Sequence, residues 1–435
     1  MPEQFTTAAS ADAAPPAGGI AGPRESPPPL APAAANPAAA AGFSAHSVAE
    51  LRQRAKKILP RGLFEYVDRG TDDERALLAM RAAIDAVHIQ PRVLVDVSGR
   101  SARTEFFDRP SAMPVAVAPT GAAGLLWFDG EIAMARAARA AGIPFTLSTA
   151  SIVSMERVAA EAGGRLWFQL YMWPEREMSL ELVQRARRCG YEALMVTLDT
   201  PTAPNREYNH RNGFSLPMRI GRRNALDVAR HPGWFFNVFA RYLLRSGVPT
   251  LENYPASLRA RLNQSQTPPK CDSLVWSDLK DLRRRWSGPL LVKGILHPED
   301  AARARECGVD AVVVSNHGGR NLDASVPPMK VLLRIVDRLH GAIPVFVDGG
   351  FNRGGDIAKA IALGARGVLV GRAPLWGLAA GGEAGALQAL ALLRAEFERV
   401  LAFAGAPSVA ALDRSYLYDD LYEDPRDDPR DSDNP

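Results

Sequence analysis

Short apolar runs alternate with longer mixed stretches along the chain from Met113 onward. The short runs are rich in β-branched residues and bounded by turn residues, which is typical of buried strands. The stretches between them are rich in alanine and charged residues, which indicates helices. Strands are expected at 114–118, 144–147, 166–170, 193–198, 289–292, 311–314, 344–347 and 367–370. Helices are expected at 130–141, 154–162, 177–188, 277–286, 298–306, 328–340, 355–363 and about 383–403.

Eight strands that each precede a helix predict an α/β fold, a (β/α)8 TIM barrel. The alternative, a doubly wound open sheet, lacks its phosphate-binding turn, because no GxGxxG lies between a strand and a helix. Helical segments are expected before the barrel. The first has capping-box spacing at Ser47 and runs to Pro60, the second covers 63–67, and the third covers 75–86. Extended segments follow at 93–97 and 104–107.

The barrel domain is expected at 44–410, between two tails. Residues 1–43 are mostly Ala, Pro, Gly and Ser, a composition that cannot bury enough surface to offset chain entropy, so a disordered tail is expected. Residues 411–435 form an acidic C-terminal tail. The sequence shows neither a secretory signal nor an apolar run of the ~18 residues that a spanning helix needs.

Composition adds little beyond these points. The three cysteines form no CxxC motif or Cys/His cluster, which argues against a disulfide framework or a metal site and favours a reducing, cytoplasmic compartment. The net charge of +4 is mild and does not indicate a nucleic-acid partner.

One long insertion follows the fourth strand, from Thr200 to about Ser277. Loops of this length inside a compact domain are usually functional or disordered. Its part 217–255 mixes aromatic residues and leucines with arginines at 219, 222, 223, 230, 241 and 245, against only Asp227 and Glu252. This composition matches an anchor that lies in the interface of a membrane. The alternative is an excursion packed on the barrel or against another subunit.

Residues 312–323 carry the clearest chemistry. Three valines end a strand, and the loop after it presents His317 and, three residues later, Arg320. A general base beside a guanidinium group suits a substrate that bears a carboxylate and must lose a proton. The alternative is an ordinary loop histidine and a surface arginine.

The other strand ends decide between these alternatives, because barrel enzymes build their sites at the carboxyl ends of the strands. Each of these ends carries polar or glycine residues. Turn formation could explain them at one strand end, but it does not explain them at all eight. The Gly-Gly and Gly-Arg turns of the last two strands suit a phosphate. Gln169, Thr197 and Ser148 suit the edge of a heterocycle, and Lys293 suits a negative charge that develops on it. A flavin mononucleotide (FMN) fits this set of groups.

From about Val48 to Gly405 the chain resembles the FMN-dependent α-hydroxy-acid dehydrogenases and oxidases. The motifs that carry the resemblance are Ala-Pro-Thr-Gly (118–121), Thr-Leu-Ser-Thr (146–149), Phe-Gln-Leu-Tyr (168–171), Thr-Leu-Asp-Thr-Pro (197–201), Asn-Arg-Glu (205–207), Leu-Val-Lys-Gly (291–294), Ser-Asn-His-Gly-Gly-Arg (315–320), Asp-Gly-Gly (348–350) and Val-Gly-Arg (370–372).

The resemblance implies a role for each site residue. The catalytic residues are His317 as the base, Asp199 as its partner, Arg320 and Tyr171. The substrate is bound by Tyr66, Tyr171, Arg206, His317 and Arg320, with both arginines on its carboxylate. Lys293 lies near N1 of the flavin and stabilises its reduced form. With Lys293, the FMN-binding residues are Pro119, Thr120, Gly121, Ser148, Gln169, Thr197, Ser315, Asp348, Gly349, Gly350, Arg353, Gly371 and Arg372. The pattern leaves hydride transfer and a carbanion route both open.

The chain departs from the usual family pattern at four positions. Asn321 stands where a glutamine is usual, and Asn352 stands where an arginine is usual, beside Arg353. Gly121 and Ala150 replace the larger residues of the short-chain oxidases, which favours a bulkier substrate, from lactate to aryl glycolates.

The resemblance is greatest to membrane-associated mandelate and lactate dehydrogenases. It implies oxidation of an (S)-2-hydroxy acid to the 2-oxo acid, with electrons passed to a quinone, by a homotetramer peripheral on the inner membrane face. One alternative is an oxidase that uses oxygen and releases hydrogen peroxide. Another is a membrane-bound flavin-binding protein without turnover, which the retention of the catalytic residues argues against. The flavocytochrome variant, which carries a haem domain before the barrel, is not expected.

Overall fold

The computed structural model describes residues 43–214, 221–264 and 271–418. The tail expected at 1–43 lies outside the described residues except for Phe43, as does the acidic tail from residue 419 onward. Before that point, the short 3-10 helix η4 (Arg414–Tyr416) buries the ring of Tyr416, whose hydroxyl donates to the carbonyl of Gly405 at 3.0 Å.

Eight parallel strands close a barrel in the order β10-β3-β4-β5-β6-β7-β8-β9, which confirms the predicted fold. They are β3 (Val115–Thr120), β4 (Phe145–Ser148), β5 (Leu166–Tyr171), β6 (Ala193–Thr197), β7 (Leu290–Ile295), β8 (Ala311–Val314), β9 (Val345–Asp348) and β10 (Gly367–Val370). The pairing register sets Ser148 beside Gln169, and Thr197 beside both Tyr171 and Lys293. Parallel pairing therefore gathers the polar strand ends at one mouth of the barrel.

Aromatic side chains fill the opposite end. Phe106, from the small antiparallel sheet of β1 (Thr104–Phe106) and β2 (Arg109–Ser111), lies with its ring centroid 5.1 Å from that of Phe346 and 6.3 Å from that of Trp167. All three side chains are fully buried. Within the described part of the chain, the amino end of the barrel is thus closed by these rings, and the ligand-sized cavity lies at the carboxyl end.

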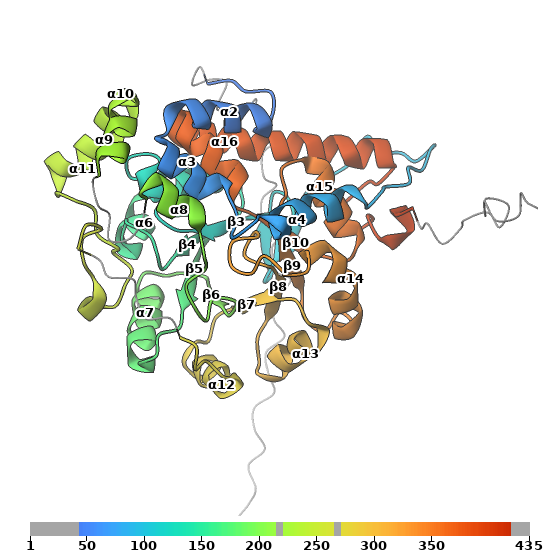
Figure 1. The fold of residues 1–435 in the computed structure, drawn as a ribbon. Coiled ribbons are helices and arrows are strands. Elements are labelled where there is room, and N and C mark those ends of the chain that lie inside the picture. The colour runs from blue at the N-terminus through green and yellow to red at the C-terminus, as the bar shows by residue number, and fades with distance from the viewer. Residues whose placement is uncertain (1–42, 215–220, 265–270, 419–435) are drawn as a thin grey trace, which may run out of the picture. The chain divides into compact units, whose positions relative to one another are not determined.

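The helices alternate with the strands as predicted, with one correction (Figure 1). They are α5 (Gly130–Ala140), α6 (Met155–Glu161), α7 (Arg176–Arg188), α12 (Trp276–Arg285), α13 (Pro298–Glu306), α14 (Pro328–Leu339), α15 (Gly354–Ala362) and α16 (Arg372–Ala404). The helix α16 begins at Arg372, eleven residues before the predicted start at 383. Non-helical backbone at Gly381 and Gly382 kinks α16, and these glycines interrupt the helical sequence pattern after its first turns. A Cβ at Gly382 would stand 2.5 Å from the Trp127 ring, so glycine is required there.

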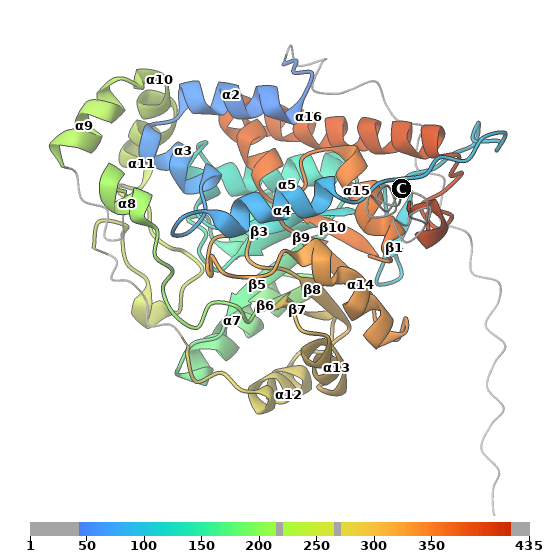
Figure 2. The same cartoon turned by 45° about the vertical axis from the view of Figure 1, so that its right-hand side comes forward.

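Three helices precede the barrel: α2 (Val48–Ile58), α3 (Arg61–Asp68) and α4 (Arg75–Asp85). The Ser47 hydroxyl accepts the Glu50 N–H at 3.1 Å, as the capping-box spacing predicts. Figures 1 and 2 show α2 running along α16, while α3 and α4 lie over the mouth of the barrel. The extended segment predicted at 93–97 forms no strand, because Leu94 takes a positive φ of 61° that interrupts the extended backbone.

The insertion after β6 folds into short helices: α8 (Glu207–Asn212), α9 (Arg222–Ala229), α10 (Pro232–Trp234), the π-helix η2 (Phe235–Phe239), α11 (Ala240–Arg245) and the 3-10 helix η3 (Ala256–Leu258). One face packs on the barrel. The Trp234 indole N–H donates to the Leu125 carbonyl at 2.8 Å, and the Tyr242 hydroxyl accepts the Asp129 N–H at 2.8 Å. The other face leaves Leu226, Phe236, Leu243 and Leu244 exposed. Among the described residues, no helix combines the length and apolarity needed to cross a membrane.

Candidate active site

The carboxyl ends of the strands open into one cavity of about 1300 Å³. Single-ligand pockets are commonly ~300–1,000 Å³, so this cavity has room for a cofactor and a substrate together. The predicted site residues that line it are Tyr66, Pro119, Thr120, Gly121, Ser148, Gln169, Tyr171, Thr197, Arg206, Lys293, His317, Arg320, Asp348, Gly349, Gly350, Gly371 and Arg372. Asp199 and Ser315 lie behind the lining, each in contact with a lining side chain.

His317 and Asp199 form a hydrogen-bonded pair, with 2.9 Å between Nδ1 and Oδ1. Because a carboxylate only accepts, Nδ1 carries the proton and Nε2 is left as the acceptor. Burial lowers the pKa of His317, and the negative charge of Asp199 only partly opposes this shift. Burial acts to raise the pKa of Asp199, but the charge and hydrogen bond of His317 hold it below its usual value. At neutral pH the pair is therefore a neutral imidazole, able to accept a proton, held by a carboxylate.

Two further contacts fix this pair. The His317 N–H donates to the Ser315 hydroxyl at 3.0 Å, and the histidine sits in the left-handed region at a φ of 59°. Asn321 donates to the Asp199 carbonyl at 2.7 Å and to the Thr200 hydroxyl at 2.9 Å. Asn321 thus steadies the segment that carries Asp199.

Arg206 and Arg320 are the two cations of the substrate end. Arg320 Nη1 donates to the carbonyl of Arg69 at 3.0 Å, and its guanidinium lies 5.1 Å from the centroid of the Tyr66 ring. Nε of Arg206 is buried and has no hydrogen-bond partner within the described part of the chain. Burial and then the positive charge of Arg320 lower the pKa of Arg206. Two partly buried guanidinium groups with no carboxylate partner among the described residues suit a carboxylate ligand.

Both predicted tyrosines reach the same region. The Tyr66 hydroxyl donates to the Gly121 carbonyl at 3.4 Å, a long hydrogen bond that a ligand can displace. Burial, reinforced by the negative charge of Asp199, raises the pKa of Tyr171 far above its usual value. Tyr171 therefore stays protonated and can act as a hydrogen-bond donor.

A second polar cluster spans β4, β5 and β6. Gln169 accepts from the Ser148 hydroxyl at 3.1 Å through Oε1 and donates to the Thr197 hydroxyl at 3.0 Å through Nε2. The Thr149 N–H also donates to Gln169 Oε1 at 3.1 Å. The side chains of this cluster are buried, so its donors and acceptors are fixed in place. It can hydrogen-bond the edge of a flat heterocycle.

Lys293 is a buried cation between the His317–Asp199 pair and the polar cluster around Gln169. Its Nζ lies 2.7 Å from the Ser315 hydroxyl and 3.0 Å from Asp348 Oδ2. Burial acts to lower the pKa of Lys293, but the charges of Asp348 and Asp199 raise it above its usual value. The ammonium therefore remains charged. Oδ1 of Asp348 is buried and unpartnered among the described residues, so it can accept a hydrogen bond from a ligand hydroxyl.

The carboxyl ends of β9 and β10 form a further part of the cavity, beside the His317–Asp199 pair and the cluster around Gln169. Gly349 and Gly350 have φ values of 100° and 87°, a conformation that exposes backbone to a ligand. Arg372 is partly buried, and its guanidinium donates to the carbonyls of Val67 at 3.1 Å and Gly318 at 2.8 Å. Burial and then the charge of Arg320 lower the pKa of Arg372 to about 10. This partly buried cation at the start of α16 suits a phosphate.

One predicted cofactor residue is not brought to the cavity. Arg353 Nη1 pairs with Glu396 of α16 at 2.5 Å, and half of the arginine side chain is exposed. The Gly354 N–H donates to the same carboxylate at 2.9 Å, so Glu396 holds the start of α15. Arg353 is therefore a link between two helices. Its neighbour Asn352, which stands where an arginine is usual in the family, does line the cavity.

These groups fit FMN on three observations. The buried cluster around Gln169 matches the hydrogen-bonding edge of a flavin, and Lys293 supplies a cation beside it. The unpartnered oxygen of Asp348 suits a ribityl hydroxyl. Arg372 and the glycine turns suit the phosphate.

The insertion contributes part of the cavity wall, which the sequence did not indicate. Leu251, Tyr254 and Leu262 line the cavity, and all three are buried. The Tyr254 ring lies edge-on to that of Trp173, with 5.1 Å between their centroids. These residues lie in irregular backbone without apolar periodicity, so only the folded chain shows that they return to the barrel.

Comparison with known proteins places these features in a family. The model of the FMN-dependent dehydrogenase family matches residues 55–419. The chain is 40% identical to (S)-mandelate dehydrogenase of Pseudomonas putida over 377 residues, 86% of this chain and 94% of that protein. It is 39% identical to 4-hydroxymandelate oxidase of Amycolatopsis orientalis over 368 residues, 85% of this chain and 97% of that protein.

The fold agrees with a solved relative. The crystal structure of the monotopic membrane protein (S)-mandelate dehydrogenase superposes with a TM-score of 0.80 at 40% identity, and the match covers 86% of this chain and all of that one. A family match over most of the chain and relatives of this similarity confirm both the resemblance and FMN as the cofactor. This chain belongs to the FMN-dependent dehydrogenase family.

Proposed function

We propose that this protein oxidises (S)-2-hydroxy acids with bulky, aryl-type side chains to 2-oxo acids and passes the electrons to a quinone at a membrane surface. The observation that carries the proposal is the convergence of the His317–Asp199 pair with Arg206 and Arg320 in one cavity. A base and two guanidinium groups suit an anionic substrate that loses a proton.

Each residue then has one task. Arg206 and Arg320 bind the substrate carboxylate, and the hydroxyls of Tyr66 and Tyr171 hydrogen-bond the substrate. Nε2 of His317 takes up a proton, and the Asp199 carboxylate stabilises the imidazolium that results. When bound, FMN would supply the acceptor for the two electrons and the second proton that the hydroxy acid loses. Lys293, which remains charged beside the predicted flavin edge, favours negative charge there.

Small residues support a bulky substrate side chain. Gly121 and Ala150 lie together in the cavity wall, where a Cβ on residue 121 would stand 3.2 Å from the Cβ of Ala150. Leu251, Tyr254 and Leu262 of the insertion supply an apolar wall. The relatives named as acting on mandelate or 4-hydroxymandelate agree with this substrate class.

Enlarging residue 150 tests the substrate class. Ala150→Trp is expected to lower kcat/KM for mandelate by about 10- to 200-fold, because a mismatch in an apolar pocket is worth ~1–3 kcal/mol. Activity with lactate is expected to change by less than about threefold. The ratio of the two kcat/KM values is the measurement. An equal loss on both substrates contradicts the proposed side-chain pocket.

The exposed face of the insertion supports the membrane proposal. Its four exposed apolar side chains share these short helices with the exposed Arg222, Arg230, Arg241 and Arg245. Apolar residues mixed with arginines favour the interface of an anionic membrane. The solved relative is described as a monotopic membrane protein. We propose peripheral attachment to the inner membrane face, with a homotetramer as the assembly.

Negative charges on the exposed apolar face of the insertion should release the protein from the membrane. The double variant Phe236→Asp/Leu244→Asp is expected to move from the membrane fraction to the soluble fraction, while the rate of flavin reduction by substrate stays within about twofold, because buried apolar area drives interfacial binding. Leu94→Asp, at a fully exposed leucine outside the insertion, is the control and should stay with the membrane. Release of the control to the same extent, or retention of the double variant, contradicts this attachment.

The second candidate is an oxidase, favoured by the similarity to 4-hydroxymandelate oxidase. Comparing peroxide release with reduction of a quinone analogue separates the two. The proposed dehydrogenase reduces the quinone analogue much faster than it releases peroxide.

A further inference from the structure

The two proposed carboxylate-binding arginines come from distant segments that share one neighbour, the turn between α3 and α4 (residues 69–74, the clasp turn). On one side this turn holds Asn205, the residue before Arg206. The Thr71 hydroxyl and the Asp72 N–H donate to the Asn205 carbonyl at 2.6 and 3.2 Å. The Asn205 side chain returns a hydrogen bond to Asp72 at 2.8 Å.

On its other side the clasp turn holds the loop of Arg320. The Arg69 carbonyl, at the C-terminal end of α3, accepts from Arg320 Nη1 at 3.0 Å. The Thr71 N–H donates to the Gly319 carbonyl at 3.0 Å. A Cβ at Gly70 would stand 2.7 Å from that same carbonyl oxygen, so the two segments are in close contact. The clasp turn therefore sets where both arginines stand.

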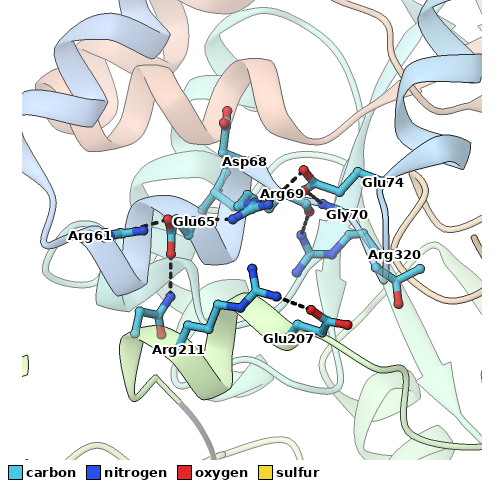
Figure 3. A network of polar contacts seen from close by, with 12 residues as sticks. Arg61, Glu65, Asp68, Arg69, Gly70, Glu74, Glu207, Arg211 and Arg320 are labelled. Carbon is cyan, nitrogen blue, oxygen red and sulfur yellow. Dashed lines mark hydrogen bonds and ion pairs between the residues drawn. The ribbon is translucent and has the colours of Figure 1, made fainter.

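One ion pair closes this turn, as Figure 3 shows. Nε and Nη2 of Arg69 each lie 3.1 Å from a carboxylate oxygen of Glu74, and Glu74 also accepts the Gly70 N–H at 2.8 Å. Glu74 has a φ of 64°, a left-handed conformation that a side chain disfavours. Burial acts to raise the pKa of Glu74, but Arg69 and the Gly70 N–H hold it below its usual value. Glu74 thus stays ionised, and the pair holds the strained turn closed.

The closed clasp turn opposes the electrostatic repulsion between Arg206 and Arg320. Burial and then the positive charge of Arg320 lower the pKa of Arg206, so the two guanidinium groups repel each other when no substrate lies between them. Groups that are held in place before binding save the substrate the cost of ordering them. A turn bonded to both segments can hold the two guanidinium groups at the spacing that a carboxylate needs.

We propose that the Arg69–Glu74 ion pair is a positioning device that holds Arg206 and Arg320 ready for the substrate carboxylate. The proposal rests on the proposed function of these two arginines. Neither Arg69 nor Glu74 needs to touch the substrate, because the ion pair acts through the backbone of the clasp turn.

Opening the pair should weaken carboxylate binding selectively. In the FMN-loaded protein, Arg69→Met is expected to raise both the KM for mandelate and the Kd for oxalate about tenfold, within the range for coupled neighbouring groups. Flavin reduction at saturating substrate should stay within about threefold. Glu74→Gln should behave alike, and the double variant should be no worse than either single one. Arg69→Lys should recover part of the loss, because lysine keeps the charge without the paired geometry.

Matched controls lie beside the clasp turn in Figure 3. Arg61 pairs with Glu65 on the same helix, and Arg211 pairs with Glu207 on α8, with 71% and 70% of the two arginine side chains exposed. Arg61→Met and Arg211→Met should leave KM and the Kd for oxalate within about twofold. FMN content and the melting temperature are measured for every variant.

Two results would overturn the proposal. One is an Arg69→Met protein whose Kd for oxalate matches that of the Arg61→Met control. The other is a rise in Kd that merely parallels loss of FMN or of folded protein, with no recovery in Arg69→Lys. Failure of the proposed function looks different, because the wild-type flavin would then remain oxidised with every 2-hydroxy acid.

Discussion

Replacing His317 by glutamine is expected to slow flavin reduction by the hydroxy acid about 10²- to 10⁴-fold, the usual contribution of a general base. The protein should stay yellow, because His317 contributes only one of the many groups around the proposed flavin site. Anaerobic stopped-flow absorbance gives the rate directly. His88→Gln, at an exposed histidine, is the control.

The pH dependence of the wild-type enzyme should agree with this role. Burial lowers the pKa of His317 below its ordinary value of 6.5, so the neutral, proton-accepting imidazole persists below that pH. Flavin reduction should therefore be constant above pH 6.5 and fall only as the pH drops through the lowered pKa. A glutamine variant that reduces its flavin at the wild-type rate would remove His317 from the chemistry.

Replacing Arg206 by methionine is expected to lower kcat/KM for mandelate by about 30- to 5000-fold, since losing one partner of a buried charge pair costs ~2–5 kcal/mol. The same change should not lower the melting temperature of the substrate-free protein. In that state the guanidinium is partly buried and repelled by Arg320, and its buried Nε has no hydrogen-bond partner among the described residues, so methionine removes an unfavourable charge.

Arg211→Met is the matched control, because this exposed arginine lies on the helix that Arg206 precedes. It should leave both kcat/KM and the melting temperature unchanged. A large fall in the melting temperature of the Arg206 variant, with KM for mandelate unchanged, would show that Arg206 serves the fold and does not bind the substrate.

The barrel and most of its mouth were predictable from the sequence, for a physical reason. Buried parallel strands form β-branched runs such as 311–314, and their carboxyl ends must share one edge. His317, Lys293 and Gly371 follow such runs directly, so their place at the mouth is set by local sequence.

Contacts between distant segments were not predictable. Arg353 looks like a phosphate ligand in sequence, but the acceptor nearest to it in the fold is Glu396, which no local pattern indicates. Tyr254 reaches the cavity through irregular backbone. The clasp turn bonds to loops more than a hundred residues away in sequence. The mixed aromatic and basic composition of the insertion left packing on the barrel as an alternative, and it did not indicate that Trp234 and Tyr242 make those contacts.

Anaerobic mixing of the purified protein with (S)-mandelate tests the central claim most directly. The predicted result is a yellow protein whose flavin absorbance bleaches with (S)-mandelate, with release of the 2-oxo acid, and stays unchanged with the (R)-enantiomer. A protein that takes up FMN but is not bleached by (S)-mandelate or by any other 2-hydroxy acid would contradict the account.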